Sequence, residues 1–313
     1  MLLSQKRLRL IIGLLWLLDG LLQLQPQMFT MNMVNGVMVP IINNQPAPIA
    51  ASLHWIVAVT TQNLTLVNLL IAVVQIAIGI LLLTGFRVRA TVIASIIWAL
   101  VVWYGGEGLS MLLTGQASIL TGAPGAVLLY PLLGLLIYPR AGEDAEHGLL
   151  PRSTFRWFLA GFWFLAALLQ LQPYWWQSGQ ISQAISGMVG QGGLNTFLVD
   201  PVLNGLSGAT ATIEIPLNIV LIVICLALGL ALVFVKEERL RPVLIASIVV
   251  SVIIWYGAEA LGMIFTGMAT DFNSGLLLVA MALACWPRAQ FIHATQNQPT
   301  RSTQSTKGSA QPA

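Results

Sequence analysis

The sequence contains very little charge, and this lack narrows the class of protein. Only 8% of the residues are Asp, Glu, Lys or Arg, whereas soluble domains have about 25%. The hydrophobic share is 57% and the mean hydropathy is +0.83. Apolar windows of roughly 20 residues, the length that crosses a bilayer, occur at 64–84 and 213–235. The sequence therefore predicts an all-α integral membrane protein and excludes an ordinary soluble domain.

Cysteine and histidine are also scarce. Cys225 and Cys285 lie in separate apolar segments without a CxxC pair, so we predict ordinary buried thiols and no redox centre. The three histidines are scattered, and no metal site with ligand spacing can be assembled from them. No phosphate-binding loop, nucleophile elbow or HExxH motif is present. The sequence thus shows no catalytic motif and no evident cofactor, which favours a binding or transport protein over an enzyme.

Hydropathy, interrupted by Pro, Gly and polar residues, predicts eight transmembrane helices. The predicted spans are 8–25, 64–84, 89–113 and 124–138 in the first half, and 155–172, 213–235, 241–265 and 274–286 in the second. With a cytoplasmic N-terminus, all 14 Lys and Arg residues lie on the inside, as the positive-inside rule requires. This distribution accounts for the pI of about 9.1 without a nucleic-acid partner. We expect a multi-pass protein of the bacterial cytoplasmic membrane with both termini in the cytoplasm.

Internal repetition divides the chain into two units. The sequence Leu-Leu-Gln-Leu-Gln-Pro at 21–26 recurs at 168–173, and Ile-Ala-Ser-Ile at 93–96 recurs at 245–248. Each unit contains four predicted spans, an even number, so both units enter and leave the membrane on the same face. The units are therefore predicted to be parallel four-helix repeats related by a pseudo-twofold axis along the membrane normal. The predicted boundaries are 1–140 for the first repeat, 141–153 for a cytoplasmic linker, 154–288 for the second repeat and 289–313 for a disordered cytoplasmic tail.

Each unit also has a long outside segment between its first and second spans. These segments, 27–63 and 174–212, contain no Lys or Arg but many Asn, Gln and apolar residues. The sequence predicts short amphipathic helices at 49–62, 178–189 and 194–206. One interpretation is that they lie in the membrane interface as a lid over the bundle. The other is that the lid covers a cavity.

A carboxylate stands inside a long apolar run in each unit. Trp103-Tyr104-Gly105-Gly106-Glu107 recurs as Trp255-Tyr256-Gly257-Ala258-Glu259. An ionisable residue at membrane depth is costly and marks a candidate functional site. In a continuous helix, Trp103, Glu107 and Met111 would share one stripe. If Gly105 and Gly106 break the helix, the carboxylate lies beside freed backbone groups instead.

Three interpretations of these glutamates remain open, the last of which is solvation at the membrane interface. Burial beside an indole disfavours the ionised acid, so we predict a raised carboxyl pKa and a ligand or proton site. The structural alternative is a protonated Glu that is hydrogen-bonded across helices to Gln23 or Gln170. Asp19 lies one turn before Gln23, whereas the second unit has Ala166 there, through specialisation or drift. The candidate site residues are Glu107, Glu259, Trp103, Trp255, Tyr104, Tyr256, Gln23, Gln170 and Asp19.

The remaining acids on the outside are at positions where water can reach them. Asp200, Glu214 and Asp271 belong to predicted outside loops or span ends, where a carboxylate is cheap to hydrate. We therefore predict that all three are solvated.

The first span carries a family resemblance. It begins Arg7-Leu8-Arg9-Leu10-Ile11-Ile12-Gly13 and continues to Asp19-Gly20, and the second unit has Phe155-Arg156-Trp157-Phe158-Leu159-Ala160-Gly161. These residues resemble the DoxX/DoxD-like group of four-helix bacterial membrane proteins, here as a tandem duplication. The resemblance implies a four-helix unit and a link to quinone-dependent sulfur oxidation. It maps no catalytic residue onto the Trp-Tyr-Gly-x-Glu element.

Three functions follow as hypotheses. The preferred one is a protein that binds or translocates a small solute or a proton at an outer-leaflet site containing Glu107 and Glu259. The second is a membrane subunit of a quinone-linked oxidoreductase, with a quinone as cofactor and a partner subunit that supplies the redox centres. The third is a structural or lipid-organising protein whose partner is the bilayer itself.

Overall fold

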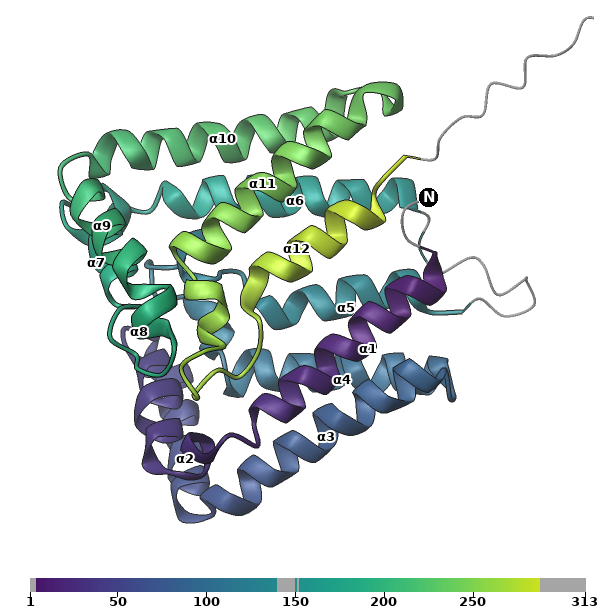
Figure 1. Ribbon diagram of the computed structural model, residues 1–313, viewed down its shortest axis with the longest axis vertical. Coiled ribbons are helices and arrows are strands. Elements are labelled where there is room, and N and C mark those ends of the chain that lie inside the picture. Colours follow the sequence, from purple (N-terminus) through teal and green to yellow (C-terminus); the bar gives the residue numbers. More distant parts are fainter. Residues whose placement is uncertain (1–3, 140–149, 151, 288–313) are drawn as a thin grey trace, which may run out of the picture.

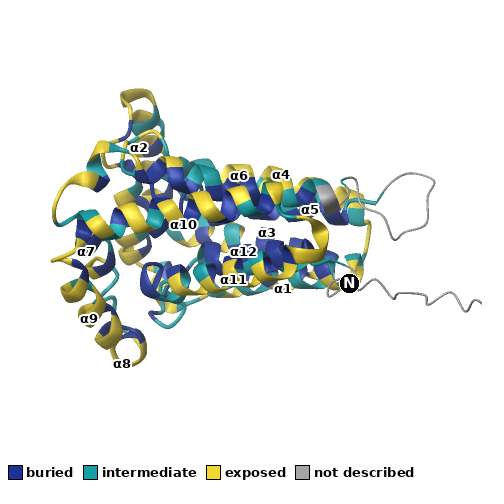
Figure 2. Cartoon of the chain, turned by 90° about the horizontal axis from the view of Figure 1, so that it is seen from above, coloured by how far each residue is buried: buried dark blue, intermediate teal, exposed yellow. Residues whose placement is uncertain are grey.

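The computed structural model describes residues 4–139, 150 and 152–287, and the elements in this part of the chain are helices. The predicted tail at 289–313 and most of the predicted linker at 141–153 lie outside the described residues. The longer helices form an elongated bundle, and several shorter ones gather at the end away from the N-terminus (Figures 1 and 2).

Eight helices occupy the predicted span ranges. They are α1 (Gln5–Leu22), α3 (Leu64–Thr84), α4 (Val88–Gly105), α5 (Ala126–Ile137), α6 (Arg152–Gln170), α10 (Glu214–Phe234), α11 (Leu240–Gly257) and α12 (Asn273–Ala284). Within the described residues, four segments are long and apolar enough to cross a membrane: Leu64–Thr84, Val88–Gly105, Glu214–Phe234 and Glu237–Gly257. Their outer faces expose large apolar side chains such as Leu66, Ile97 and Ile253, which is the arrangement that a lipid environment favours.

The shorter helices lie mainly at the bundle end seen on the left of Figure 2. The α-helices there are α2 (Ala47–Gln62), α7 (Gln180–Ser186), α8 (Asn195–Leu198) and α9 (Asp200–Thr210). The predicted helix at 49–62 agrees with α2, while the predicted helix at 194–206 is divided in two at Val199. One-turn helices complete the segments between the long helices: η1 (Pro26–Phe29), η2 (Met33–Met38), η3 (Pro40–Ile42), η4 (Gly108–Met111), η5 (Ile119–Thr121), η6 (Pro173–Trp176), η7 (Glu237–Arg239) and η8 (Ala260–Met263).

Small residues let the first two long helices approach closely. A Cβ atom added to Gly79 of α3 would lie 2.6 Å from the backbone nitrogen of Leu17 in α1. A Cβ added to Gly20 of α1 would lie 2.8 Å from the backbone nitrogen of Ile76. Close backbone approach of this kind is how helices associate without a hydrophobic driving force. Between α6 and α10, Gly229 instead makes room for a side chain, because its added Cβ would meet the ring of Phe164 at 2.8 Å.

Buried hydrogen bonds of the same type recur in both halves. Trp16 Nε1 donates to Ser95 Oγ at 2.8 Å, and Trp163 Nε1 donates to Ser247 Oγ at 3.0 Å. These bonds fasten α1 to α4 and α6 to α11, and they satisfy indole N–H groups that would otherwise be buried unpaired.

Loops of each half reach into the other half. Gln172 Nε2 and Trp175 Nε1 donate to the carbonyl of Ala117 at 3.2 and 3.1 Å, and Gln170 Nε2 donates to Ser118 Oγ. In the opposite direction, the segment at 266–272 of the second half lies against the first half, where the methyl of Met268 comes within 2.9 Å of a Cβ added to Gly36. The halves are therefore interlocked near the lid end.

Candidate functional site

The Trp-Tyr-Gly-x-Glu elements lie where the third long helix of each half ends. Helix α4 ends at Gly105 and α11 ends at Gly257, so the continuous helices predicted at 89–113 and 241–265 are wrong. The alternative in which the glycines break the helix is confirmed, and the stripe of Trp103, Glu107 and Met111 does not form. Instead, Leu109, Ser110 and Met111 have φ values of 56°, 50° and 58°.

The second half repeats this left-handed turn. Ala260, Leu261 and Met263 have φ values of 49°, 58° and 55°. Non-glycine residues avoid this region, and each costs of order 1–3 kcal/mol unless the surroundings hold it. Backbone strain of this kind concentrates at sites that serve a function or anchor a structure, so the contacts around the two turns decide which applies.

Each glutamate connects the broken helix to the start of the next one. Glu107 accepts hydrogen bonds from Ser110 Oγ at 2.8 Å and from the backbone N–H of Val127, in the first turn of α5, at 3.2 Å. Glu259 accepts from Ser274 Oγ and from the N–H of Gly275, in the first turn of α12. Free N–H groups at a helix start favour a carboxylate. The predicted partners Gln23 and Gln170 are wrong, since these bonds run to the following helix.

The aromatic residues beside the glutamates have structural bonds of their own. Trp103 Nε1 donates to the carbonyl of Pro124 at 2.8 Å, and Trp255 Nε1 donates to that of Phe272 at 2.7 Å. The Tyr104 hydroxyl pairs with Ser52 Oγ of α2, and the Tyr256 hydroxyl donates to the carbonyl of Leu198 in α8 at 3.2 Å. Each tyrosine therefore fastens a lid helix to a long helix.

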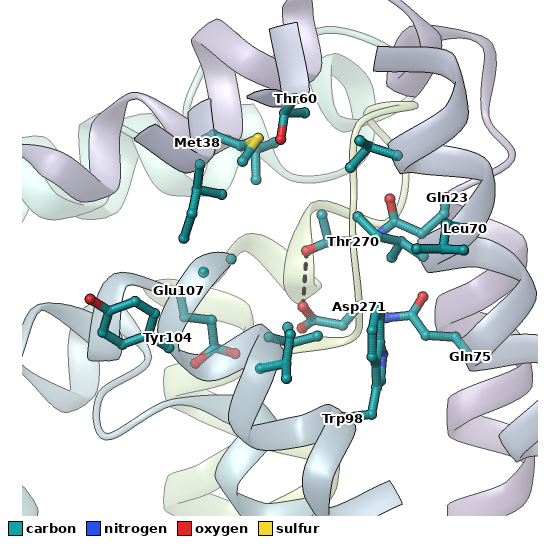
Figure 3. Close-up of a pocket in the computed structure, with 18 of the residues that line it drawn as sticks. Gln23, Met38, Thr60, Leu70, Gln75, Trp98, Tyr104, Glu107, Thr270 and Asp271 are labelled. Atoms are coloured by element: carbon teal, nitrogen blue, oxygen red, sulfur yellow. Dashed lines mark hydrogen bonds between the residues drawn. The ribbon is translucent and has the colours of Figure 1, made fainter. Parts of the chain in front are cut away.

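A cavity of about 720 Å³ lies under the lid of the first half (Figure 3). Its walls come from η2, α2, α3 and α4, from the end of α1, and from the loop before α12. Most lining side chains are apolar. The lining residues with hydrogen-bonding side chains are Gln23, Thr60, Gln75, Trp98, Tyr104, Glu107, Thr270 and Asp271.

The structure separates the predicted site residues into two groups. Gln23, Tyr104 and Glu107 line the cavity. The other six, which the cavity lining does not include, are Glu259, Trp103, Trp255, Tyr256, Gln170 and Asp19. Glu107 is partly exposed, whereas Glu259 is 1% exposed. The two glutamates therefore share a local structure but not an environment.

Asp19 belongs to a separate buried pair. It accepts a hydrogen bond from the Tyr130 hydroxyl at 2.5 Å, and both residues are buried. At the corresponding places, the second half has Ala166 and Leu278. Acid and partner thus differ together between the halves, which indicates that the pair is a unit of the first half's core.

Sequence reasoning missed Asp271, which enters the first half's cavity from the second half. It accepts from Thr270 Oγ1 at 2.9 Å and from the N–H of Asn273 at 2.6 Å. Asp271 is partly exposed and lines the cavity, which the prediction of an ordinary solvated acid did not anticipate. The predictions that Asp200 and Glu214 are solvated are wrong, since these residues are 6% and 4% exposed. Glu214 accepts from the N–H of Ser182, and Asp200 from the N–H of Gly190, both at 3.1 Å.

Gln75 and Trp98 were also missed, and their environment is informative. Gln23 and Gln75 are each 4% exposed. Their Oε1 atoms, together with Trp98 Nε1, are buried without a hydrogen-bond partner among the described residues. Buried polar atoms are paired in the large majority of cases. A polar Gln75 within the apolar run 64–84 was the available signal, because an intramembrane polar residue is a functional hypothesis by default.

Burial raises the pKa of both cavity carboxyls and of Glu259. Glu107 lies beyond the end of α4, and burial, followed by the neighbouring Asp271, raises its pKa to about 8, against hydrogen bonds from Ser110 and Val127 that lower it. Burial raises the pKa of Glu259, beyond the end of α11, to about 7, although the Ser274 bond opposes this. Burial also raises the pKa of Asp271. Both glutamate shifts have the direction predicted from the sequence.

We expect the folded protein to lose stability as the pH rises from about 4.5 to about 8. An acid whose pKa is higher in the folded than in the unfolded state binds more protons when folded, so the free energy of unfolding falls with pH across that window. Melting temperatures of the detergent-purified protein from pH 4.5 to pH 8 measure this. Glu107→Gln and Glu259→Gln should each flatten the profile; an unaltered slope in both variants would contradict the assignment.

The residues of the site limit the kind of ligand that it could hold. Within the described part of the chain, no group of three or more His, Cys, Asp or Glu residues could hold a metal ion. The cavity offers hydrogen-bond acceptors and carboxyl groups in an apolar enclosure, an arrangement suited to a small molecule. No protein-family model, curated protein or solved structure matches the chain.

Proposed function

We propose that the chain is an eight-span protein of the bacterial cytoplasmic membrane, built from two parallel four-helix repeats with cytoplasmic termini. Recurring contacts support the repeats: Asn68 Nδ2 donates to the carbonyl of Gln23 at 2.7 Å, and Asn218 Nδ2 donates to that of Gln170 at 3.2 Å. Helices α1, α5, α6 and α12 supply the other four spans. The distribution of Lys and Arg supports the orientation, with the lid helices outside.

Within this architecture, the protein binds a small solute or a proton-carrying ligand in the cavity under the first lid. The observation that carries the proposal is the pair of carboxyl groups, Glu107 and Asp271, that share an otherwise mostly apolar cavity (Figure 3). Asp271 makes Glu107 harder to ionise, and two acids in one mostly apolar cavity cost free energy, which indicates a functional site. Glu107 and Asp271 are the groups that contact the ligand. Glu259 lies outside the cavity and serves only to join the end of α11 to the start of α12.

Filling the cavity tests the proposal. Ile71 lines the cavity on α3, and Leu221 is its counterpart on α10. Small molecules released from the purified protein by denaturation are identified by mass spectrometry. We expect a compound that accompanies the wild type and Leu221→Trp but is depleted at least about tenfold in Ile71→Trp, since a filled cavity excludes it. Equal amounts in both variants would refute the cavity as the binding site.

A membrane subunit of a quinone-linked oxidoreductase is the second candidate, as the DoxX/DoxD-like resemblance implies. The mostly apolar lining of the cavity favours it, because a quinone ring and its tail dissolve in such surroundings. The electrons would have to come from a partner subunit. Release of a quinone in the same mass-spectrometric experiment, together with purification of a redox subunit alongside this chain, would select this candidate over simple solute binding.

A further inference from the structure

The cavity opens sideways between α3 and α4. Leu70 of α3 and Ile97, Leu100 and Val101 of α4 line the cavity and are at the same time exposed on the outside of the bundle. A residue that faces a cavity and the surroundings at once forms the rim of an opening. These two helices are among the four that are long and apolar enough to cross a membrane. The opening therefore faces the region of the lipid chains.

The lining of the cavity is rich in hydrogen-bond acceptors. The Oε1 atoms of Gln23 and Gln75 are buried and unpaired, and the Glu107 and Asp271 carboxyls lie on the same cavity. Figure 3 shows Asp271 between Glu107 on one side and Gln75 with Trp98 on the other. Leaving a buried acceptor unsatisfied costs about 1–3 kcal/mol. A ligand with several donors would satisfy these acceptors.

The charges of the lining residues indicate the charge of the ligand. Among the described lining residues, two are acidic and none is Lys, Arg or His. A bound cation would stabilise both carboxylates, which otherwise resist ionisation in this enclosure. The aromatic face of Trp98 is also compatible with a cation.

We propose that the ligand is a lipid-soluble amine, whose ammonium group binds among Glu107, Asp271, Gln23 and Gln75 while its apolar chain extends through the opening between α3 and α4. This inference rests on the proposed binding function and names its ligand class. The apolar rim accounts for the chain, the two acidic side chains account for the charge, and the unpaired amide oxygens account for the N–H donors. An anionic or purely acceptor-bearing head group would meet the same acceptors without satisfying them.

Radiolabelled dodecylamine is the probe, measured with the full chain in phosphatidylcholine nanodiscs and corrected with empty nanodiscs. We expect saturable binding that dodecanol, dodecanoate and dodecyltrimethylammonium displace at least about tenfold less well than unlabelled dodecylamine, because they lack the charge, have the wrong charge or lack donors. Glu107→Gln and Gln75→Leu should each weaken binding about tenfold or more. Glu259→Gln, with the same local structure outside the cavity, should bind like the wild type.

The outcomes separate this inference from the proposed function. Binding of dodecanol or dodecanoate that Ile71→Trp abolishes, without preference for the amine, would overturn the amine and leave the binding cavity in place. Dodecylamine binding that is equal in Glu107→Gln, Gln75→Leu and Glu259→Gln would overturn the assignment of the head-group site. If no probe bound, or if Ile71→Trp left all probe binding unchanged, the amine would also be overturned. The mass-spectrometric experiment with Ile71→Trp would then test separately whether the cavity is a binding site.

Discussion

Replacing Gly79 with Leu is expected to prevent the protein from folding. An added Cβ would lie 2.6 Å from the backbone nitrogen of Leu17 and 2.8 Å from its Cα, so no side-chain adjustment can relieve the contact. Helices α1 and α3 would have to separate, and the bundle would lose the close contact between them. We expect a loss above about 4 kcal/mol, in the range of severe overpacking and core disruption. Size-exclusion chromatography in mild detergent should show aggregate in place of a monodisperse peak.

The matched control is Gly161→Leu in α6. This glycine is exposed, and an added Cβ meets nothing within 4 Å. The same substitution therefore adds the same apolar side chain without a clash, and Leu has a better helix propensity than Gly. We expect a monodisperse protein with a melting temperature at or above that of the wild type. If Gly79→Leu behaved like Gly161→Leu, the close α1–α3 contact would be wrong.

Replacing Gly125 with Ala is expected to disrupt the cavity carboxyl. Gly125 has φ of 118°, and an added Cβ would lie 2.3 Å from both Glu107 Oε2 and Ser110 Oγ, and 2.9 Å from Trp103 Cδ1. The methyl group would push Glu107 away from the start of α5 and break its bond with Ser110. Backbone strain of about 1 kcal/mol adds to this loss. The melting temperature should fall, and any ligand that requires Glu107 should be lost.

Gly115→Ala isolates the backbone component. Gly115 also has a positive φ, 76°, but an added Cβ meets nothing within 4 Å. This variant should show only the cost of the left-handed backbone, about 1 kcal/mol, with ligand binding intact. Equal losses of stability and binding in the two variants would mean that strain alone, and not displacement of Glu107, explains the Gly125 effect.

Much of the helical arrangement could be predicted from the sequence because its signals are local. Apolar runs bounded by Pro, Gly and polar residues placed eight helices, and the lid helix at 49–62 followed from its amphipathic composition. Glu107 was identified because a carboxylate in an apolar run is costly wherever it lies. The glycine pair before it gave the helix break as one of two alternatives, which only the three-dimensional contacts could decide.

The cavity could not be predicted because its residues come from segments distant in sequence. Asp271 reaches the site across the contact between the halves. A hydropathy scale assigns an aspartate the same value whether it lies in a cavity or in a hydrated loop. Internal similarity also misled, since it suggested equal roles for Glu107 and Glu259. The differing positions held the better signal: Gln75, Trp98 and Asp271 correspond to Cys225, Val250 and Ala123, so only one half has the polar cavity lining.

The exchange of loops between the halves bears on why the two units are joined in one chain. In a symmetric homodimer of a single unit, each loop would deliver the same residue to its neighbour, so both sites would be acidic or neither would. In the tandem duplication that we propose, this constraint is absent. One unit can contribute Asp271 to the other while receiving Ala123 in return, so that an acidic cavity lining can be built in one half alone.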